Sequence, residues 1–310
     1  MLDRPLSPFA RFAWAVLAYT VFVILWGAFV RATGSGAGCG DHWPTCNGDI
    51  VPRAPQMETV IEFGHRLTSG LAGILSLILP VWAWRIYPRG HRVRKAALGS
   101  FAFMMIEAAI GAGLVLLEHV AYNVSVARGY WMAAHLVNTF ILVGWLLATA
   151  YWASGGAAVR LRNQGRMGLA LGAAILGTMV LGASGSVAAL GDTLTLGGGI
   201  DPESDPIVGA LVGLRIFHPL IGCLVLFLVG WAVWQAEQDD RPGLTMGRWA
   251  LGLFLAQMVI GVVNVQLLAP VWLQLVHLAM TNAIWIALLL FAAQSLRVRE
   301  SQRELEPVAA

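Results

Sequence analysis

The sequence predicts an all-α, polytopic membrane protein whose eight transmembrane helices form two pseudo-symmetric, parallel four-helix bundles. Three observations support this fold class. Hydrophobic residues make up 58% of the 310 residues and charged residues only 12%, whereas a soluble domain carries about 25% charged residues. Apolar segments of helix length recur along the chain, and the second half of the chain repeats motifs of the first half.

The predicted helices follow one another with short polar connections. Each apolar segment is about 20 residues long, which is enough for a helix to cross a hydrocarbon core of ~30 Å. Such a segment is predicted to be helical because every backbone polar group in lipid needs a partner within the protein. Small residues spaced like Gly168 and Gly172 are expected to let helices approach closely. The eight segments are residues 12–32, 60–84, 97–117, 131–152, 167–189, 213–234, 248–268 and 272–294.

The distribution of Lys and Arg predicts the orientation of these helices. With the N-terminus inside, 15 of the 20 Lys and Arg residues fall in inner segments and 5 in outer segments. Positive charge gathers on the cytoplasmic side of membrane proteins. We therefore expect a multi-pass protein of the cell inner membrane with both termini in the cytoplasm. The net charge of +3 reflects this topology and requires no nucleic-acid partner.

An internal repeat divides the chain at the basic inner segment 153–166. Four helices return the chain to the side on which it started, so the two halves have the same orientation and are not an inverted repeat. We therefore predict an N-terminal half, residues 1–155, and a C-terminal half, residues 156–310. The matching segments are Ala32–Asp41 with Ala183–Asp192, Glu107–Gly111 with Gln257–Gly261, His65 with His218, and His135–Thr139 with His277–Thr281.

Two of the three cysteines lie in the first outer loop. Cys39 and Cys46 flank a stretch that contains Gly and Pro, which help the chain to turn. A disulfide is permitted outside the cytoplasm, so we predict a Cys39–Cys46 bridge. The alternatives are two free thiols, or half of a metal site with His42. Cys223 falls in an apolar helix and is expected to pack in the core.

Four of the seven histidines fall in predicted helices, and three fall in loops. The helical ones are His65, His135, His218 and His277, in the second, fourth, sixth and eighth segments. Each lies about five residues into its segment, or about 8 Å at 1.5 Å per residue. Because the even helices all run from outside to inside, the four imidazoles are expected to share one depth in the outer half of the bilayer.

Paired histidines at one depth favour haem iron as the ligand. Ionisable groups within membranes are costly and are usually functional, although a single such histidine is often only packed and hydrogen-bonded. Haem iron accepts axial histidines, and a four-helix bundle can hold the macrocycle between facing helices. The expected pairs are His65 with His135 and His218 with His277. Zinc is less attractive, because each half offers only two strong ligands and no nearby cysteine.

Arginines beside these histidines are candidates to pair with haem propionates. Arg66 adjoins His65, Arg128 precedes His135 by seven residues, and Arg215 precedes His218 by three. The alternative is that an arginine at a helix end simply extends its charge to the membrane surface.

The two halves differ in their acidic residues. Glu62 aligns with Arg215 at the repeat offset, and residues three apart share a helix face, so Glu62 is expected to face the same macrocycle as His65. A carboxylate there could carry protons or hold a polar intermediate; the alternative is a Glu62–Arg66 ion pair that only orients the helix. Glu107 aligns with neutral Gln257, and we expect it to have a polar packing or hydrogen-bonding role. This asymmetry suggests a reacting site in the first half and a redox cofactor site in the second.

With these features the sequence resembles the haem A synthase family over about residues 10–295. The resemblance rests on the eight helices, the four-plus-four repeat, the four helical histidines, the Glu-x-x-His-Arg element at Glu62–Arg66, and the Cys-x6-Cys first outer loop. It implies that His218 and His277 hold a haem b cofactor. It also implies that His65 and His135 face the substrate, haem O, and that Glu62 is the catalytic carboxylate.

The family's reaction is the stepwise hydroxylation of one porphyrin methyl to a geminal diol, which dehydrates to the formyl group of haem A. The resemblance implies that haem O synthase and cytochrome oxidase assembly factors act alongside the protein; the electron donor is unknown. Some members have a second cysteine pair in the equivalent loop of the second half, but residues 191–212 contain none. If oxygen is activated at the substrate iron, one histidine of the first half has to bind weakly or leave, and the sequence does not indicate which.

Two other function classes account for the histidines. A cytochrome b that transfers electrons from quinol would use all four histidines but gives Glu62 no special task. A haem carrier or exporter would need a site open to release, and the sequence has no long Trp-rich outer loop.

Overall fold

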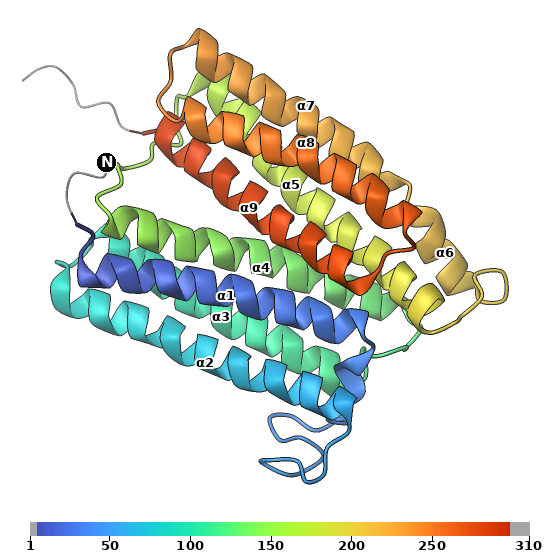
Figure 1. Cartoon of the computed structure of the whole chain (residues 1–310). Helices are drawn as coiled ribbons and strands as arrows, with labels where there is room; N and C mark the ends of the chain where they lie inside the picture. The colour runs from blue at the N-terminus through green and yellow to red at the C-terminus, as the bar shows by residue number, and fades with distance from the viewer. Residues whose placement is uncertain (1–4, 298–310) are drawn as a thin grey trace, which may run out of the picture.

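The computed structural model describes residues 5–297, and these form two four-helix bundles packed side by side (Figure 1). Eight helical segments are long and apolar enough to span a membrane, so the predicted all-helical, polytopic fold is confirmed. The first bundle contains α1 (Pro8–Ala32), α2 (Met57–Ile86), α3 (Arg92–Leu116) and α4 (Val126–Ala153). The second contains α5 (Gly165–Asp192), a broken segment made of α6 (Pro206–Leu214) and α7 (Phe217–Gln238), α8 (Leu244–Gln266) and α9 (Val271–Ser295).

The helix order within each bundle puts the histidine-bearing helices at opposite corners. In the first bundle α2 and α4 each pack against both α1 and α3. In the second bundle α7 and α9 each pack against both α5 and α8. The two histidine-bearing helices of each bundle are therefore diagonal to each other, with the other two helices between them.

The two bundles meet along α1 and α4 of the first and α5 and α9 of the second. The indole Nε1 of Trp285 in α9 donates to the backbone oxygen of Phe140 in α4 over 2.9 Å, and the two rings lie 4.9 Å apart. Both residues are buried. The interface is therefore part of the hydrophobic core, and the bundles do not merely touch at their surfaces.

The sixth predicted helix is interrupted, which the hydropathy pattern did not indicate. The chain forms α6, breaks at Arg215 and Ile216, and resumes as α7 at Phe217. Pro219 has no N–H to donate to the carbonyl of Arg215, and that carbonyl instead accepts from the N–H of His218 over 3.2 Å. The break puts His218 in the first turn of α7. The loop predicted at 191–212 is also shorter, because α5 continues through a π-helical turn, η2 (Thr193–Gly197).

Two packing expectations are wrong. Gly172 has no neighbouring atoms within 4 Å of an added Cβ, so Gly168 and Gly172 do not mark a close helix approach. Cys223 is exposed on α7 rather than packed in the core. The reason is the same in both cases. The neighbouring helices, and not the local sequence pattern, determine which face of a helix packs.

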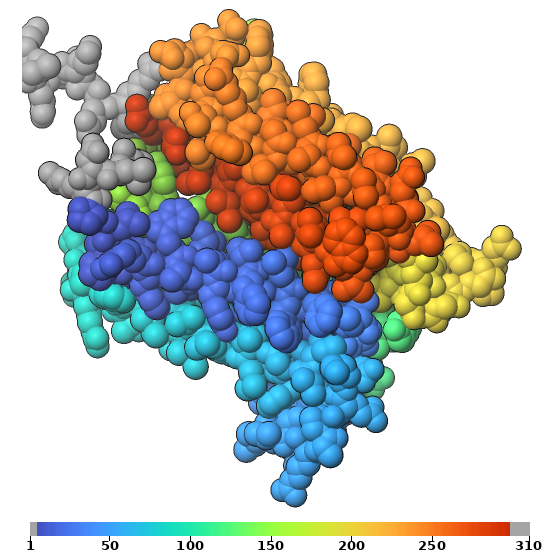
Figure 2. Space-filling view, in the orientation of Figure 1, coloured from blue at the N-terminus to red at the C-terminus, as the bar shows by residue number. Residues whose placement is uncertain are grey.

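Two of the connections between helices protrude from the bundles. The loop between α1 and α2 begins with a short turn, η1 (Ser35–Ala37), and protrudes in light blue in Figure 2, while the connection between α5 and α6 protrudes in yellow. Both leave the bundles at the same end, where α1 ends and α2 begins (Figure 1).

Candidate haem sites and the disulfide loop

The two histidines of the second bundle face each other. The ring centres of His218 and His277 lie 6.3 Å apart. Two imidazoles on opposite sides of one iron, each with a metal–nitrogen bond of roughly 2 Å, would have ring centres about 6 Å apart. Ser184 Oγ lies 3.1 Å from Nδ1 of His218 and leaves Nε2 free to bind iron. The arrangement fits a haem held by both side chains.

Each of the four helical histidines lies against a glycine of a neighbouring helix. A Cβ built on Gly27 of α1 would lie 3.0 Å from Cε1 of His65, and one on Gly185 of α5 would lie 2.8 Å from Cε1 of His218. The corresponding distances are 3.8 Å from Gly111 of α3 to His135 and 3.3 Å from Gly261 of α8 to His277. Carbon contacts are normally about 3.5–4.0 Å. An alanine at Gly185 would therefore force His218 to shift, and alanines at Gly27 and Gly261 would force His65 and His277 to give by a few tenths of an ångström.

The histidines of the first bundle have different partners. Nε2 of His135 lies 3.1 Å from Oε1 of Glu107 on α3. Glu107 also accepts hydrogen bonds from Asn138 Nδ2, over 2.5 Å, and from the Thr139 hydroxyl. Nδ1 of His65 is buried and has no hydrogen-bond partner among residues 5–297. The hydrogen-bonding role expected for Glu107 is therefore directed at a candidate iron ligand.

Two of the expected arginines have unused hydrogen-bond donors. Nε of Arg128 and Nε of Arg215 are buried without a partner in the part of the chain that the structure describes. The Arg128 side chain is 2% exposed and donates from Nη1 to the backbone oxygen of Asn123 over 2.9 Å. Arg215 pairs with Asp192 at 2.7 Å. Buried donors without partners are uncommon, and a propionate would satisfy them.

Arg31 joins the two bundles, a role that the sequence did not indicate. Its guanidinium donates to the backbone oxygen of Ala189 over 3.0 Å, to Thr193 Oγ1 over 2.6 Å and to Gln274 Oε1 over 2.8 Å. Its partners come from α5, η2 and α9, far away in the sequence, so no local signal could have identified them.

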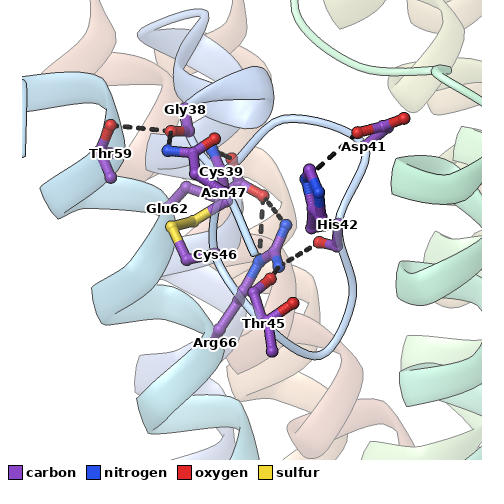
Figure 3. Close-up of a disulfide and its surroundings, with 10 residues drawn as sticks. All are labelled: Gly38, Cys39, Asp41, His42, Thr45, Cys46, Asn47, Thr59, Glu62 and Arg66. Carbon is purple, nitrogen blue, oxygen red and sulfur yellow. Dashed lines mark hydrogen bonds and ion pairs between the residues drawn. A yellow bond between two sulfur atoms is a disulfide. The ribbon is translucent and has the colours of Figure 1, made fainter. Parts of the chain in front are cut away.

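Cys39 and Cys46 form a disulfide, as predicted. The bond closes a loop that sits over the start of α2 (Figure 3). Both sulfurs are engaged, which contradicts the alternatives of free thiols and of a metal site with His42. Instead, Nδ1 of His42 lies 3.2 Å from Asp41 Oδ1 at the exposed edge of the loop.

Glu62 and Arg66 are both bound to this loop. Glu62 is 3% exposed, and its Oε2 accepts from the backbone N–H of Cys39 over 2.8 Å. Its Oε1 accepts from Arg66 at 2.5 Å and 3.1 Å. Arg66 also donates to the backbone oxygens of His42 and Thr45, each over 2.6 Å (Figure 3).

These contacts differ from the expectations for both residues. The carboxylate of Glu62 contacts the disulfide loop and its i+4 neighbour, so the ion pair considered as an alternative is present. The donors of Arg66 are directed at Glu62 and at loop carbonyls rather than toward the interior of the bundle. A backbone N–H and two backbone carbonyls of the loop are groups that side-chain patterns do not reveal, so the sequence could not indicate these partners.

Comparison with known proteins identifies the family. Residues 10–289 match the COX15-CtaA family, described as cytochrome oxidase assembly protein. The chain is 31% identical over 285 residues to a protein of Symbiobacterium thermophilum named Heme A synthase, with 86% of this chain and 89% of that protein covered. A protein of Geobacillus kaustophilus with the same name is 47% identical over 105 residues, covering 34% of this chain and 33% of that protein.

A Thermus thermophilus relative is longer than this chain. It is named Protoheme IX farnesyltransferase and is 47% identical over 304 residues, covering 96% of this chain. This chain spans only 50% of that relative's length, and the same is true of the corresponding protein from a second strain. Because one family match extends over nearly all of both bundles, the chain belongs to the COX15-CtaA family of cytochrome oxidase assembly proteins, the family of the haem A synthases.

Proposed function

We propose that the protein is a haem A synthase, which oxidises one methyl group of haem O to the formyl group of haem A. The first half, residues 1–155, takes the substrate between His65 and His135. The second half, residues 156–310, holds haem b between His218 and His277. The observation that carries this proposal is the pair of imidazoles 6.3 Å apart in the second bundle, in a chain of this family.

The proposed reaction proceeds in two hydroxylations. The first would convert the methyl group to a hydroxymethyl group and the second would give a geminal diol, from which loss of water leaves the aldehyde. In each hydroxylation one atom of dioxygen would enter a C–H bond, and the other would leave as water with two electrons from an external donor and two protons. Bound haem b supplies one-electron redox chemistry to the site. The remaining contributions come from the chain itself, which binds the substrate through imidazoles and keeps it within the membrane.

Glu62 is the proposed catalytic carboxylate. It is buried near the start of the helix that carries His65, and its two oxygens are held by Cys39 N–H and Arg66. A buried carboxylate with fixed hydrogen bonds is suited to accept or hold a proton at a defined position. The disulfide loop then has a positioning role, since it supplies one of the two groups that fix the carboxylate.

Arg128 and Arg215 are the proposed propionate partners. In each of them the Nε atom is buried without a partner among the described residues, although the Arg215 side chain as a whole is 33% exposed. Charge-assisted bonds to carboxylates are the strong ones for arginine. The proposal places one propionate-binding arginine in each half. Arg66 is a weaker candidate, because its donors are already directed at Glu62 and at two backbone carbonyls.

The proposed location is the cell inner membrane with both termini in the cytoplasm, following the distribution of Lys and Arg. The substrate is proposed to come from a haem O synthase. The long Thermus thermophilus relative, whose name describes farnesyl transfer to protohaem IX, supports this, because this chain matches half of it. Farnesylation of protohaem is the class of reaction that has to precede oxidation of the methyl group.

Extraction of haem from a suitable host tests the proposal. The full chain is expressed in a membrane that contains haem O but no other haem A synthase, and the extracted haems are separated by chromatography. Haem A is expected only with the active chain. Glu62→Ala is expected to abolish haem A while bound b-type haem remains, and Glu58→Ala, an exposed residue in the first turn of the same helix, serves as the matched control.

Substitution of the second histidine pair tests the cofactor site separately. His218→Ala and His277→Ala are each expected to remove the resident haem from the visible spectrum. If wild-type membranes yield only haem O and haem b, the protein is not a synthase, and an electron-transfer cytochrome becomes the better description. If neither alanine variant changes the spectrum, the cofactor site is wrong.

A further inference from the structure

We propose that Glu107 makes His135 the weak, exchangeable ligand of the haem in the first half, while His65 remains the firm one. The inference deepens the proposed function, on which it rests, because it assigns the histidine that yields when the substrate iron needs an open position. Two observations on residues 5–297 support it. Glu107 contacts the ring of His135, and Gln257 at the equivalent position of the second half does not contact the ring of His277 through a hydrogen bond.

Glu107 forms a specific polar cluster with α4. Its Oε1 lies 3.1 Å from Nε2 of His135 and also accepts from the hydroxyl of Thr139. Its Oε2 accepts from Nδ2 of Asn138 over 2.5 Å, and the same amide donates to the backbone oxygen of Phe103 over 3.0 Å. Asn138 and Thr139 of α4 thus hold the carboxylate in place against the imidazole of His135.

The second half has the same positions with the opposite hydrogen-bonding sense. Gln257, the counterpart of Glu107, donates from Nε2 to the backbone oxygen of His277 over 2.9 Å and to Thr281 Oγ1 over 2.8 Å. Met280 stands where Asn138 stands in the first half. The amide is therefore tied to the backbone and hydroxyl of α9, and no hydrogen bond joins it to the ring of His277 among the described residues.

This difference changes what the imidazole can offer to iron. A ring nitrogen that donates its N–H to a carboxylate cannot at the same time give a lone pair to a metal. Nε2 of His135 must leave Glu107 to bind iron, and a hydrogen bond to a charged group shifts such an equilibrium by roughly tenfold to a hundredfold. His218 is arranged in the other way, since its bond to Ser184 uses Nδ1 and leaves Nε2 free.

The packing around the four rings gives independent support. Gly111 leaves 3.8 Å between an added Cβ and His135, which is an ordinary contact, whereas the distances at the other three histidines are 2.8, 3.0 and 3.3 Å. His135 is thus the ring least confined by its glycine. A ligand that has to swing between a carboxylate and a metal needs this room, and a fixed ligand does not.

Carbon monoxide binding to ferrous protohaem tests the inference. The full chain is purified in detergent and loaded with protohaem, and carbon monoxide is titrated into the reduced protein. Carbon monoxide binds only where a ligand yields, so the haem of the first half is expected to react and that of the second half is not. Glu107→Gln, which copies the second half, is expected to weaken carbon monoxide binding about tenfold or more and to raise the low-spin fraction of the ferric protein.

Three further variants make the test independent of folding and of general charge effects. Asn138→Met removes a donor that holds Glu107 and is expected to act in the same direction as Glu107→Gln. The double change Gln257→Glu with Met280→Asn builds the first-half set in the second half and is expected to make that haem reactive. Glu118→Gln, an exposed residue just beyond the end of α3, is expected to leave binding unchanged. Haem content and the thermal midpoint are measured for each variant.

The outcomes separate this inference from the proposed function. Unchanged carbon monoxide binding in Glu107→Gln, or a wild-type chain in which neither haem reacts or the first half takes up no haem, overturns the role of Glu107. Haem A formation is measured on its own by extraction. If the wild-type chain makes haem A but Glu107→Gln binds carbon monoxide unchanged, the proposed function stands and the role of Glu107 is refuted. If no haem A forms but Glu107→Gln weakens carbon monoxide binding, the ligand asymmetry stands and the proposed function is refuted.

Discussion

Replacing Gly185 with alanine is expected to weaken haem binding in the second half. The added Cβ would lie 2.8 Å from Cε1 and 3.2 Å from Nδ1 of His218, whereas carbon contacts are normally about 3.5–4.0 Å. The ring would have to move by about 0.7 Å or more. That movement disturbs the 3.1 Å contact between Nδ1 and Ser184 Oγ, which orients the ring.

The size of the effect follows from the cost of overpacking. Inserting a methyl group into a close contact costs about 1–3 kcal/mol, which corresponds to roughly 5- to 150-fold in an equilibrium constant. The assay is the transfer of haem from the purified, full-length protein to an excess of a soluble haem-binding acceptor, followed in the visible spectrum. The variant is expected to lose its resident haem faster and to retain a smaller fraction at equilibrium.

A matched control lies on the same helix. Gly172 of α5 has no atoms within 4 Å of an added Cβ, so Gly172→Ala is expected to retain haem like the wild type. The glycines opposite the other histidines form a graded series, with distances of 3.0 Å at Gly27, 3.3 Å at Gly261 and 3.8 Å at Gly111. The expected order of haem loss follows these distances. Wild-type retention in Gly185→Ala, or a greater loss in Gly172→Ala, would refute the reasoning.

Three further experiments test other parts of the structure. Changing Cys39 and Cys46 together to serine removes a constraint worth about 2.5 kcal/mol for a loop of this size. Limited proteolysis is expected to cut the loop between α1 and α2 faster, and an unchanged cleavage rate would show that the disulfide does not order this loop. Arg31→Met removes three hydrogen bonds between the bundles and is expected to cost about 2 kcal/mol, measured as a lower thermal midpoint in detergent; an unaltered midpoint would contradict that role. Leu171 is fully buried, and Leu171→Ala is expected to lower the free energy of unfolding by about 2–5 kcal/mol. Leu176 on the same helix is 65% exposed, and Leu176→Ala should change the free energy of unfolding by less than about 0.5 kcal/mol. Equal losses in the two variants would contradict the packing of α5.

Local patterns in the sequence were sufficient for the helices, the four histidines and the disulfide. Hydropathy is a property of consecutive residues, so eight spans could be predicted. Their ends lie within about five residues of the observed helices, except in the sixth, which begins at Pro206 rather than at 213 and is interrupted before Pro219, and after α5, where η2 continues to Gly197. The disulfide joins cysteines seven residues apart in one loop, and no distant element was needed to predict it. Pairing of His218 with His277 followed from the repeat, which relates whole helices to one another.

The partners of individual side chains were decided by tertiary structure. Glu62 shares a helix with His65, as its spacing indicated, yet its carboxylate is held by the backbone N–H of Cys39 in a loop. Arg31 binds groups that lie 158 to 243 residues away in the sequence, and Glu107 reaches His135 across a helix interface. The sequence alone determined which residues can cross a membrane and which chemistry they carry, because both depend on residue type and local spacing. Which atoms meet depends on how helices rotate and pack against one another, and only the folded chain fixes that.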